Sequence, residues 1–298
     1  MFDRLRSFVL VTEEGTFTAA ARRAHVSQPA LTAAIARLEE EIGARLFHRG
    51  PGGAQLTAEG EALLPRARAA LASVEDGKRA VREIAGLDAG EVRIAGGATA
   101  CTHFLPRLLA RFRAAHPKVR LILREATSDG VERGLEAGDV DLGVVTAERG
   151  EPWLDDELIL VRSRHVDAAG APFVTFPPGG TTRTLLDRHF PEARIAMEIA
   201  SMAAIVAHVQ EGIGIALLSR HAVRQELESR VLLRVEDPRT PIVRPYRLVH
   251  RGLNRLTPSA AALRELLLEE RSAARAVSGS SRRGARRAPS ASIGGRSR

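Results

Sequence analysis

The 298-residue sequence contains a single cysteine, Cys101. One cysteine cannot form a disulfide within the chain, and no cysteine–histidine cluster has metal-ligand spacing, so we expect no metal and no cofactor. The sequence also lacks any apolar run that approaches about 18 residues, which argues against a membrane-spanning helix. Its first residues lack the apolar core and cleavage site of a signal peptide. Together these absences predict a cytoplasmic protein.

Acidic residues are absent from the end of the chain. Residues 271–298 contain eight of the 44 Lys and Arg residues and none of the 36 acids, so residues 1–270 carry no formal net charge. The net charge of +8 therefore describes this tail, which is rich in Ser, Gly and Ala and is predicted to be disordered. Three roles remain open for it: a solvated extension, non-specific contacts to DNA phosphates, or a membrane-surface role. The last is disfavoured because no apolar face accompanies the charge.

The length and the apolar patterns predict a multidomain α/β chain. Residues 1–58 show short helical periods, and residues 59–89 form one long helical pattern. From residue 90 to residue 270, short apolar runs alternate with helical stretches, which is typical of α/β units with mostly parallel strands. We expect this last domain to have two lobes, one over residues 90–162 and 256–270 and the other over residues 163–255.

The first domain has the pattern of a helix-turn-helix. Apolar residues at helical spacing predict three helices, whose inner faces are Leu5, Phe8, Val9 and Thr12, then Phe17, Ala20, Ala21 and Ala24, then Leu31, Ile35, Leu38 and Ile42. Ser27 is placed to cap the third helix, and Pro29 falls in its first turn, where a missing N–H costs little. The helix over residues 28–41 would present its N-terminal end to the major groove of DNA.

A short hairpin wing is predicted after these helices, over residues 45–57, with a Gly-rich interruption at residues 50–53. Helical periodicity by itself does not distinguish this arrangement from a generic small helical bundle without a DNA role. At the level of pattern both interpretations remain open.

The residues themselves favour the first interpretation. They run in the order Phe8-Val9, Gly15-Thr16-Phe17-Thr18-Ala19-Ala20-Ala21, Val26-Ser27-Gln28-Pro29-Ala30-Leu31-Thr32, Leu38-Glu39-Glu40-Glu41-Ile42-Gly43-Ala44-Arg45-Leu46-Phe47, Arg49 and Leu56-Thr57-x-x-Gly60. This stretch closely resembles the N-terminal domain of LysR-type regulators, almost continuously from Phe8 to Pro65. The resemblance implies a sequence-specific transcriptional regulator that binds double-stranded DNA and is not an enzyme. It also implies that the side chains facing DNA are those of Thr18, Arg22, Ser27, Gln28, Pro29, Thr32 and Arg49.

Two features depart from the family pattern. The family often has Arg, Lys or Gln just after the position of Thr32, whereas this chain has Ala33 and Ala34. The wing carries Gly52 and Gly53 where a second basic residue is usual. Fewer long donors predict less direct readout of bases and more weight on thymine methyl groups and DNA shape.

The long helix after the wing has a narrow apolar stripe. Its members lie close to a 3.5-residue spacing and are Leu64, Ala67, Leu71, Val74, Val81 and Ala85. Pro65 should kink the helix or shift its start. A two-helix coiled coil between subunits accounts best for the stripe, with a helix lying on its own domain as the alternative. The family resemblance also implies a homodimer through this helix, commonly extended to a homotetramer, on a partly palindromic promoter site.

The remaining chain resembles the family more loosely but keeps the order of its elements, which implies a two-lobed, periplasmic-binding-protein-like effector domain. We expect strands over residues 92–95, 119–123 and 141–145 in one set, and over 173–176, 194–199, 214–218 and 246–250 in a second. A cleft should then lie at the carboxyl ends of the strands. The loop over residues 177–181 is placed to close it partly, and a short connection between Val161 and Phe173 trims the second lobe.

Hydroxyl residues recur where helices of this domain are expected to begin. Helix starts favour anions such as a carboxylate or a sulfate, although each one by itself is more often an ordinary cap. The family resemblance places a small-molecule effector here, and the expected contacts are Thr99, Ala100, Thr102, Thr127, Ser128, Ser201 and Met202. Binding would change the geometry of lobes or subunits and so the spacing of the DNA-reading heads.

Two other classes of protein compete with a regulator: an enzyme and a solute-binding protein. An enzyme would use Cys101, with a lowered pKa at a helix start, and His103, but no third orienting group is evident. A redox-sensing or an inert Cys101 remains an alternative. Gly212-x-Gly214 is not a dinucleotide motif, because it lacks the third glycine and precedes a strand. A solute-binding protein would share the two-lobed plan but not the N-terminal domain.

Overall fold

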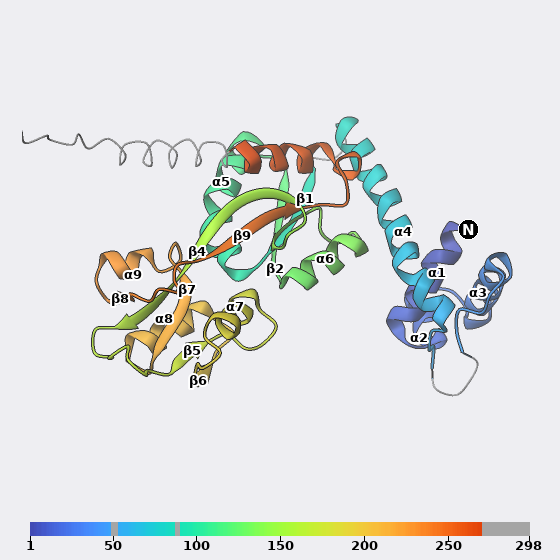
Figure 1. Cartoon of the computed structure of the whole chain (residues 1–298). Helices are drawn as coiled ribbons and strands as arrows, with labels where there is room; N and C mark the ends of the chain where they lie inside the picture. The colour runs from blue at the N-terminus through green and yellow to red at the C-terminus, as the bar shows by residue number, and fades with distance from the viewer. Residues whose placement is uncertain (49–52, 87–89, 270–298) are drawn as a thin grey trace, which may run out of the picture.

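The computed structural model describes residues 1–48, 53–86 and 90–269 (Figure 1). Three expectations from the sequence lie outside these residues: the DNA contact of Arg49, the tip of the wing at residues 50–52, and the disorder of the arginine-rich tail over residues 271–298.

The N-terminal domain consists of α1 (Phe2–Glu14), α2 (Phe17–Arg23) and α3 (Gln28–Ile42). Thr16 and Ser27 cap α2 and α3, since their hydroxyl oxygens accept hydrogen bonds from Ala19 N at 3.2 Å and Ala30 N at 3.3 Å. The three helices close around a buried core formed by Phe8, Val9, Val11, Ala20, Ala21, Leu31, Ile35, Leu38, Leu46, Phe47 and Ala67. The predicted helix-turn-helix is confirmed.

The base of the wing is a bridge between Phe47 and Leu56, which pair antiparallel. The Glu39 carboxylate fixes it to α3 by accepting hydrogen bonds from Leu46 N at 2.8 Å and Phe47 N at 3.4 Å. Phe47 also packs its ring against Phe8, with ring centroids 5.4 Å apart. The wing therefore leaves the domain from a fixed position.

The long helix α4 (Ala58–Ile84) begins beneath this wing, capped by Thr57, and continues through Pro65. Its stripe divides into two parts. In the first part Leu64, Ala67 and Leu71 pack on the N-terminal core. In the second part Val74 and Val81 are 41% and 66% exposed, and Ile84, which is not a member of the stripe, is 77% exposed beside them. The alternative of a helix lying on its own domain thus describes the first half, while the second half leaves an apolar face uncovered in the monomer.

The effector domain contains, among the described residues, one continuous sheet in the order β2-β1-β3-β9-β4-β7-β5-β6, with β8 also paired to β4. The strands are β1 (Glu91–Gly96), β2 (Arg120–Glu125), β3 (Leu142–Thr146), β4 (Glu151–Ser163), β5 (Phe173–Thr175), β6 (Ile195–Glu198), β7 (Ile215–Ser219), β8 (Leu232–Val235) and β9 (Ile242–Val249). Pairs within each lobe are parallel, β2-β1-β3 in the first and β7-β5-β6 in the second. The lobes are joined by β4 and β9, which run antiparallel to each other and cross between the lobes (Figure 1).

Helices cover both lobes. They are η1 (Ala100–Phe104, a π-helical turn), α5 (Leu105–Ala115), α6 (Ser128–Ala137), α7 (Thr181–His189), α8 (Met202–Gln210), α9 (Arg224–Glu228) and the 3-10 turn η2 (Leu253–Arg255), followed by a helical stretch over residues 258–269. That final stretch returns to the first lobe, where Trp153 Nε1 donates a hydrogen bond to Leu267 O at 3.0 Å.

Two differences from the expected strands concern the crossing pair. β4 has 13 residues and was not predicted, because the acidic run Asp155–Glu157 interrupts its apolar alternation. The strand expected over residues 246–250 spans Ile242–Val249 and pairs with β3 of the first lobe, so it connects the lobes and does not belong to the second alone.

Candidate DNA-reading face and interlobe cleft

The start of α3 and the side of α2 next to it present one exposed surface. The side chains expected to face DNA, apart from Arg49, all lie exposed on it: Thr18, Arg22, Ser27, Gln28, Pro29 and Thr32. The side chain of Arg22 forms no hydrogen bond or ion pair with any other described residue, whereas that of its neighbour Arg23 is paired with Glu14 at 2.5 Å. Arg22 is therefore available for a phosphate group.

The turn between the two helices is tight. His25 adopts φ 54°, and the amide of Val26 donates to Ala21 O at 3.0 Å. Ala20 and Ala21 are buried where α2 meets the neighbouring helices, and their small side chains allow the close packing of the turn. The geometry projects Gln28 and Pro29 from the free end of α3, where a helix enters a major groove.

A cleft of about 640 Å³ lies between the lobes. Its walls are the segments that follow the carboxyl ends of the parallel strands, as expected for an open α/β sheet. The lining residues are Gly97, Ala98, Thr99, Glu125, Ala126, Thr127, Ser128, Asp129, Val144, Val145, Thr146, Phe176, Pro177, Pro178, Gly179, Gly180, Thr181, Thr182, Thr184, Ala200, Arg244 and Tyr246. The loop over residues 177–181 forms part of the wall.

The cleft brings together only part of the expected effector set. Thr99, Thr127 and Ser128 line it. Ala100 is buried behind it, Thr102 is exposed outside the lining, and Ser201 caps α8 by accepting from Ala204 N at 3.5 Å. Met202 also lies outside the lining, and the adjacent Ala200 contributes instead.

Among the described residues that line the cleft, Arg244 is the only basic one, and sequence reasoning missed it. Its side chain is 5% exposed and its Nη2 lies 2.5 Å from Asp156 Oδ2. Nη1 donates to Thr182 Oγ1 at 2.9 Å and Nη2 to Thr99 Oγ1 at 3.4 Å, so Arg244 joins the two lobes. Its Nε is buried without a hydrogen-bond partner among the described residues. The signal was available, because Ile242, Arg244, Tyr246 and Leu248 alternate as the buried face of β9.

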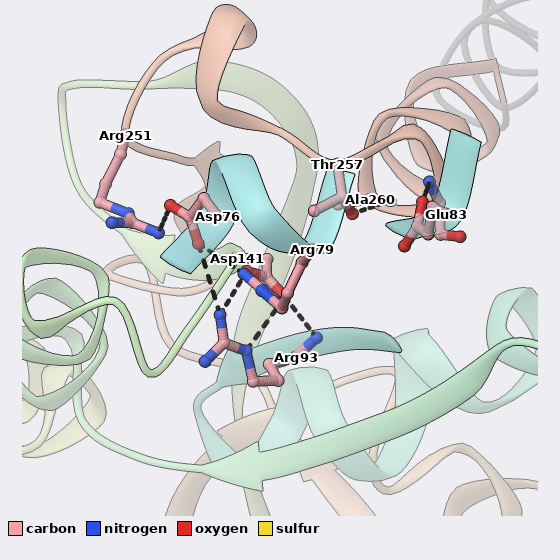
Figure 2. A network of polar contacts seen from close by, with 9 residues as sticks. Asp76, Arg79, Glu83, Arg93, Asp141, Arg251, Thr257 and Ala260 are labelled. Carbon is pink, nitrogen blue, oxygen red and sulfur yellow. Dashed lines mark hydrogen bonds and ion pairs between the residues drawn. The ribbon is translucent and has the colours of Figure 1, made fainter. Parts of the chain in front are cut away.

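A second polar network joins the linker helix to the effector domain (Figure 2). Asp76 of α4 pairs with Arg251, which follows β9, and with Arg79 at 2.6 Å. Arg79 and Arg93 both reach Asp141, at 2.7 and 2.8 Å. One turn further along α4, Glu83 accepts a hydrogen bond from Ser259 N at 3.0 Å. We call the group Asp76, Arg79, Arg93, Asp141 and Arg251 the linker network.

Burial and pairing act in opposite directions on the linker network. Burial raises the pKa of Asp141, but the hydrogen bonds and charges of Arg93 and Arg79 outweigh it and hold this pKa below its ordinary value. The pKa of Arg79 is raised, because Asp141 and Asp76 outweigh the lowering by burial.

The close approach of α4 to α6 depends on Gly138, which has φ +78° and whose added Cβ would lie 2.3 Å from Ala72 Cβ.

Cys101 does not have the properties of a nucleophile. Burial, with a smaller contribution from Glu125, raises the pKa of its thiol to about 11, opposite to the lowered value that an enzyme would need. Its Sγ donates to Gly96 O at 3.3 Å.

In the described part of the chain no group of three or more His, Cys, Asp and Glu is arranged to hold a metal ion. Nor does any described helix have the length and apolar character needed to cross a bilayer.

Comparisons with known proteins give two family matches along the chain. Residues 2–61 match the family "Bacterial regulatory helix-turn-helix protein, lysR family", and residues 85–272 match the "LysR substrate binding domain". The RuBisCO operon transcriptional regulator of Allochromatium vinosum is 30% identical over 288 residues, which cover 90% of this chain and 95% of the relative. The regulator CfxR of Cupriavidus necator is 31% identical over 288 residues, covering 89% and 90%.

A solved structure of full length shows the same arrangement. The crystal structure of CbnR, a LysR family transcriptional regulator, is 25% identical with a TM-score of 0.64 and covers 91% of this chain and 99% of that one. CbnR bound to its target DNA aligns with a TM-score of 0.62 at 25% identity, over 90% and 98% of the two chains.

Proposed function

This chain belongs to the LysR family of bacterial transcriptional regulators, and on that premise we propose that it binds a partly palindromic promoter site as a dimer or tetramer, under the control of an anionic small molecule held between its lobes. Residues 1–58 form the reading head, residues 59–89 the linker and residues 90–270 the effector domain. Because promoter DNA is the target, the protein acts in the cytoplasm and has no catalytic role.

The proposal of DNA binding rests on the exposed side chains at the start of α3 and on the adjacent side of α2. Six side chains at the family's DNA-facing positions are exposed together, and Arg22 has no partner among the described residues. Gln28 is placed for base contacts and Arg22 for phosphate contacts.

Selection of DNA fragments by the full-length protein tests this. Gln28→Ala should relax the preference at one position of each half-site, by about 1–3 kcal/mol of discrimination, while the matched variant Gln225→Ala on α9 keeps it. Arg22→Ala should lower the slope of log affinity against log salt by about 1, and Arg188→Ala on α7 should not. If no sequence is enriched by the wild-type protein, the proposal is wrong.

The preference for an anion rests on Arg244. Its guanidinium faces the cleft with one N–H unpartnered among the described residues, and the first turn of α7 at Thr181 and Thr182 offers backbone amides without a side-chain cap. Sulfate or succinate should therefore raise the unfolding temperature of the full chain. Arg244→Gln should remove that protection and Arg247→Gln, outside the cleft, should retain it. Thr99→Val provides a second variant if Arg244→Gln does not fold.

The coupling to DNA runs through β3 and β9. These strands pair antiparallel, and each has cleft residues near one end, Thr146 on β3 and Arg244 on β9. At their other ends Asp141 directly precedes β3 and Arg251 closely follows β9, and both belong to the linker network. A shift of the two strands when the cleft closes would therefore move α4 and with it the reading head.

Asp76→Asn tests this path, with Glu61→Gln as the control at an exposed position of the same helix. The first variant removes a buried charge from the linker network and should change the spacing of protected half-sites in a DNase footprint while keeping the preferred bases. The control should leave the footprint as it is. An unchanged footprint for Asp76→Asn would exclude the linker network from the coupling.

A further inference from the structure

A second cavity, of about 480 Å³, shares no lining residue with the cleft. Its walls come from the end of η1, the middle of β4, the turn after β7, and α9. The residues are Phe104, Asp155, Asp156, Glu157, Arg220, His221, Arg224, Leu227 and Glu228, and we call this cavity the rear pocket. The buried pair of Asp156 and Arg244 separates it from the cleft, because Asp156 lines one cavity and Arg244 the other.

The apolar part of the rear pocket is preorganised. Phe104 is held in edge contact with Trp153 and Tyr246, at centroid distances of 6.4 and 5.7 Å. On its other side the ring of His221 lies 4.8 Å from it at an angle of 38°. Together with Leu227, the rings of Phe104 and His221 form a surface that suits a flat or branched apolar group.

The charges around the rear pocket leave one carboxylate uncommitted. Glu157 pairs with Arg220 at 3.0 Å, Glu228 with Arg224 at 3.8 Å, and Asp156 with Arg244. The side chain of Asp155 is exposed and forms no hydrogen bond or ion pair with any described residue. An additional acceptor lies close by, since Glu226 Oε2, on the same helix as Leu227, is enclosed without a hydrogen-bond partner among the described residues.

The neutral form of His103 is favoured near the pocket. Burial, and then the proximity of His221, lower the pKa of His103, although Glu226 and Asp156 oppose this.

We propose that the rear pocket is a second small-molecule site, which takes an organic monocation: a primary amine or a guanidinium attached to an aromatic or branched aliphatic body. The cationic group meets Asp155, and the body stacks on Phe104 and His221. An anion would meet the carboxylates of Asp155 and Asp156 and would be repelled. An inorganic metal ion is a poor fit, because no group of three suitable ligands occurs among the described residues.

Benzylamine, which is cationic at pH 7, is a suitable first probe, with benzyl alcohol and benzoate as its neutral and anionic counterparts. Binding to the full-length protein is followed by ligand-observed saturation-transfer NMR. For a probe of this size we expect a Kd of roughly 1 mM, and binding of the two counterparts at least about tenfold weaker. Equal binding of benzyl alcohol and benzylamine, or no saturable binding of benzylamine, would overturn the proposal.

Variants place the site. Asp155→Asn removes the uncommitted charge and should weaken benzylamine binding about three- to tenfold, whereas Asp167→Asn, an equal change at an exposed position outside the pocket, should change it less than twofold. Leu227→Trp should fill the pocket and abolish binding. If this larger substitution does not fold, the two Asp variants still decide, and an equal effect of both would refute the site. Selection of DNA fragments is unaffected by any of these results, so this proposal and the proposed function fail separately.

Discussion

Asp156→Asn should be one of the most damaging single substitutions in the effector domain, because it leaves the charge of Arg244 buried without a counter-ion. The two side chains are 1% and 5% exposed and their nearest atoms are 2.5 Å apart. With charge centres about 4 Å apart and an effective dielectric constant of about 20, their attraction is about 4 kcal/mol. Asp156 also accepts from Ser219 Oγ at 2.7 Å, and an asparagine keeps at most part of that arrangement.

We therefore expect Asp156→Asn to lower the free energy of unfolding by about 3–5 kcal/mol, or the unfolding temperature by roughly 6–20 °C for a domain of this size. Urea unfolding can be followed by the fluorescence of the chain's single tryptophan, Trp153, which is buried in the first lobe. Glu157→Gln is the matched control. Its pair with Arg220 is exposed, so this change should remain within about 1 kcal/mol.

A double variant separates the charge from the shape. Arg244→Met combined with Asp156→Leu removes both charges, and its stability should return to within about 2 kcal/mol of the wild-type value. A loss of less than about 1 kcal/mol for Asp156→Asn, or a double variant no more stable than the single one, would refute the view that an uncompensated charge is the cause.

Three further predictions follow from local geometry. Gly60→Ala should destabilise the reading head by about 1–3 kcal/mol in urea unfolding, because a Cβ would lie 2.3 Å from Leu46 O. Gly77→Ala on the same helix has open space around the added Cβ and should stabilise the protein by about 0.5–1 kcal/mol. Similar effects of the two substitutions would contradict this. The Cys101 thiol should react with iodoacetamide at pH 8 about 100-fold more slowly than in the denatured chain, since burial raises its pKa to about 11 from an ordinary value of 9.0. Equal rates would disprove this. The pKa of Asp141 is lower in the folded than in the unfolded protein, so its contribution to stability is complete above the unfolded pKa of about 3.9 and is lost as the pH falls through the folded pKa. Asp141→Asn should therefore flatten the acid limb of the stability–pH profile. An unchanged limb would count against the linker network.

The N-terminal domain could be predicted closely because its signals are local. Thr16, Ser27 and Thr57 each cap a helix through a residue three positions further on, so a few consecutive residues fix where each helix begins. Gly43, with φ 79°, fixes the end of α3 in the same way.

The crossing strands were harder, because their stabilising contacts are far apart in sequence. The partner that makes a buried Asp156 tolerable in β4 is Arg244, 88 residues away, so the acidic run looked like a loop. Alternation along β9 places Arg244 in the buried register, but a charge in that register reads as an exception until its partner is known. Similarly, Ser201 and Thr102 have the composition of a binding turn, and only the tertiary fold directs them away from the cleft.

The position of the Asp156–Arg244 pair connects the two proposed ligands. An anion in the cleft lies beside Arg244, and a cation at Asp155 in the rear pocket lies beside Asp156, so each ligand adds a charge next to one member of the buried pair. A ligand that draws one member of the pair toward its own cavity loosens the other member, which favours binding of the second ligand. Thermodynamic linkage then requires that each ligand raise the affinity for the other by the same factor. Since Arg244 lies on the strand that leads to Arg251 and the linker helix, a regulator built in this way would respond most strongly when both small molecules are present.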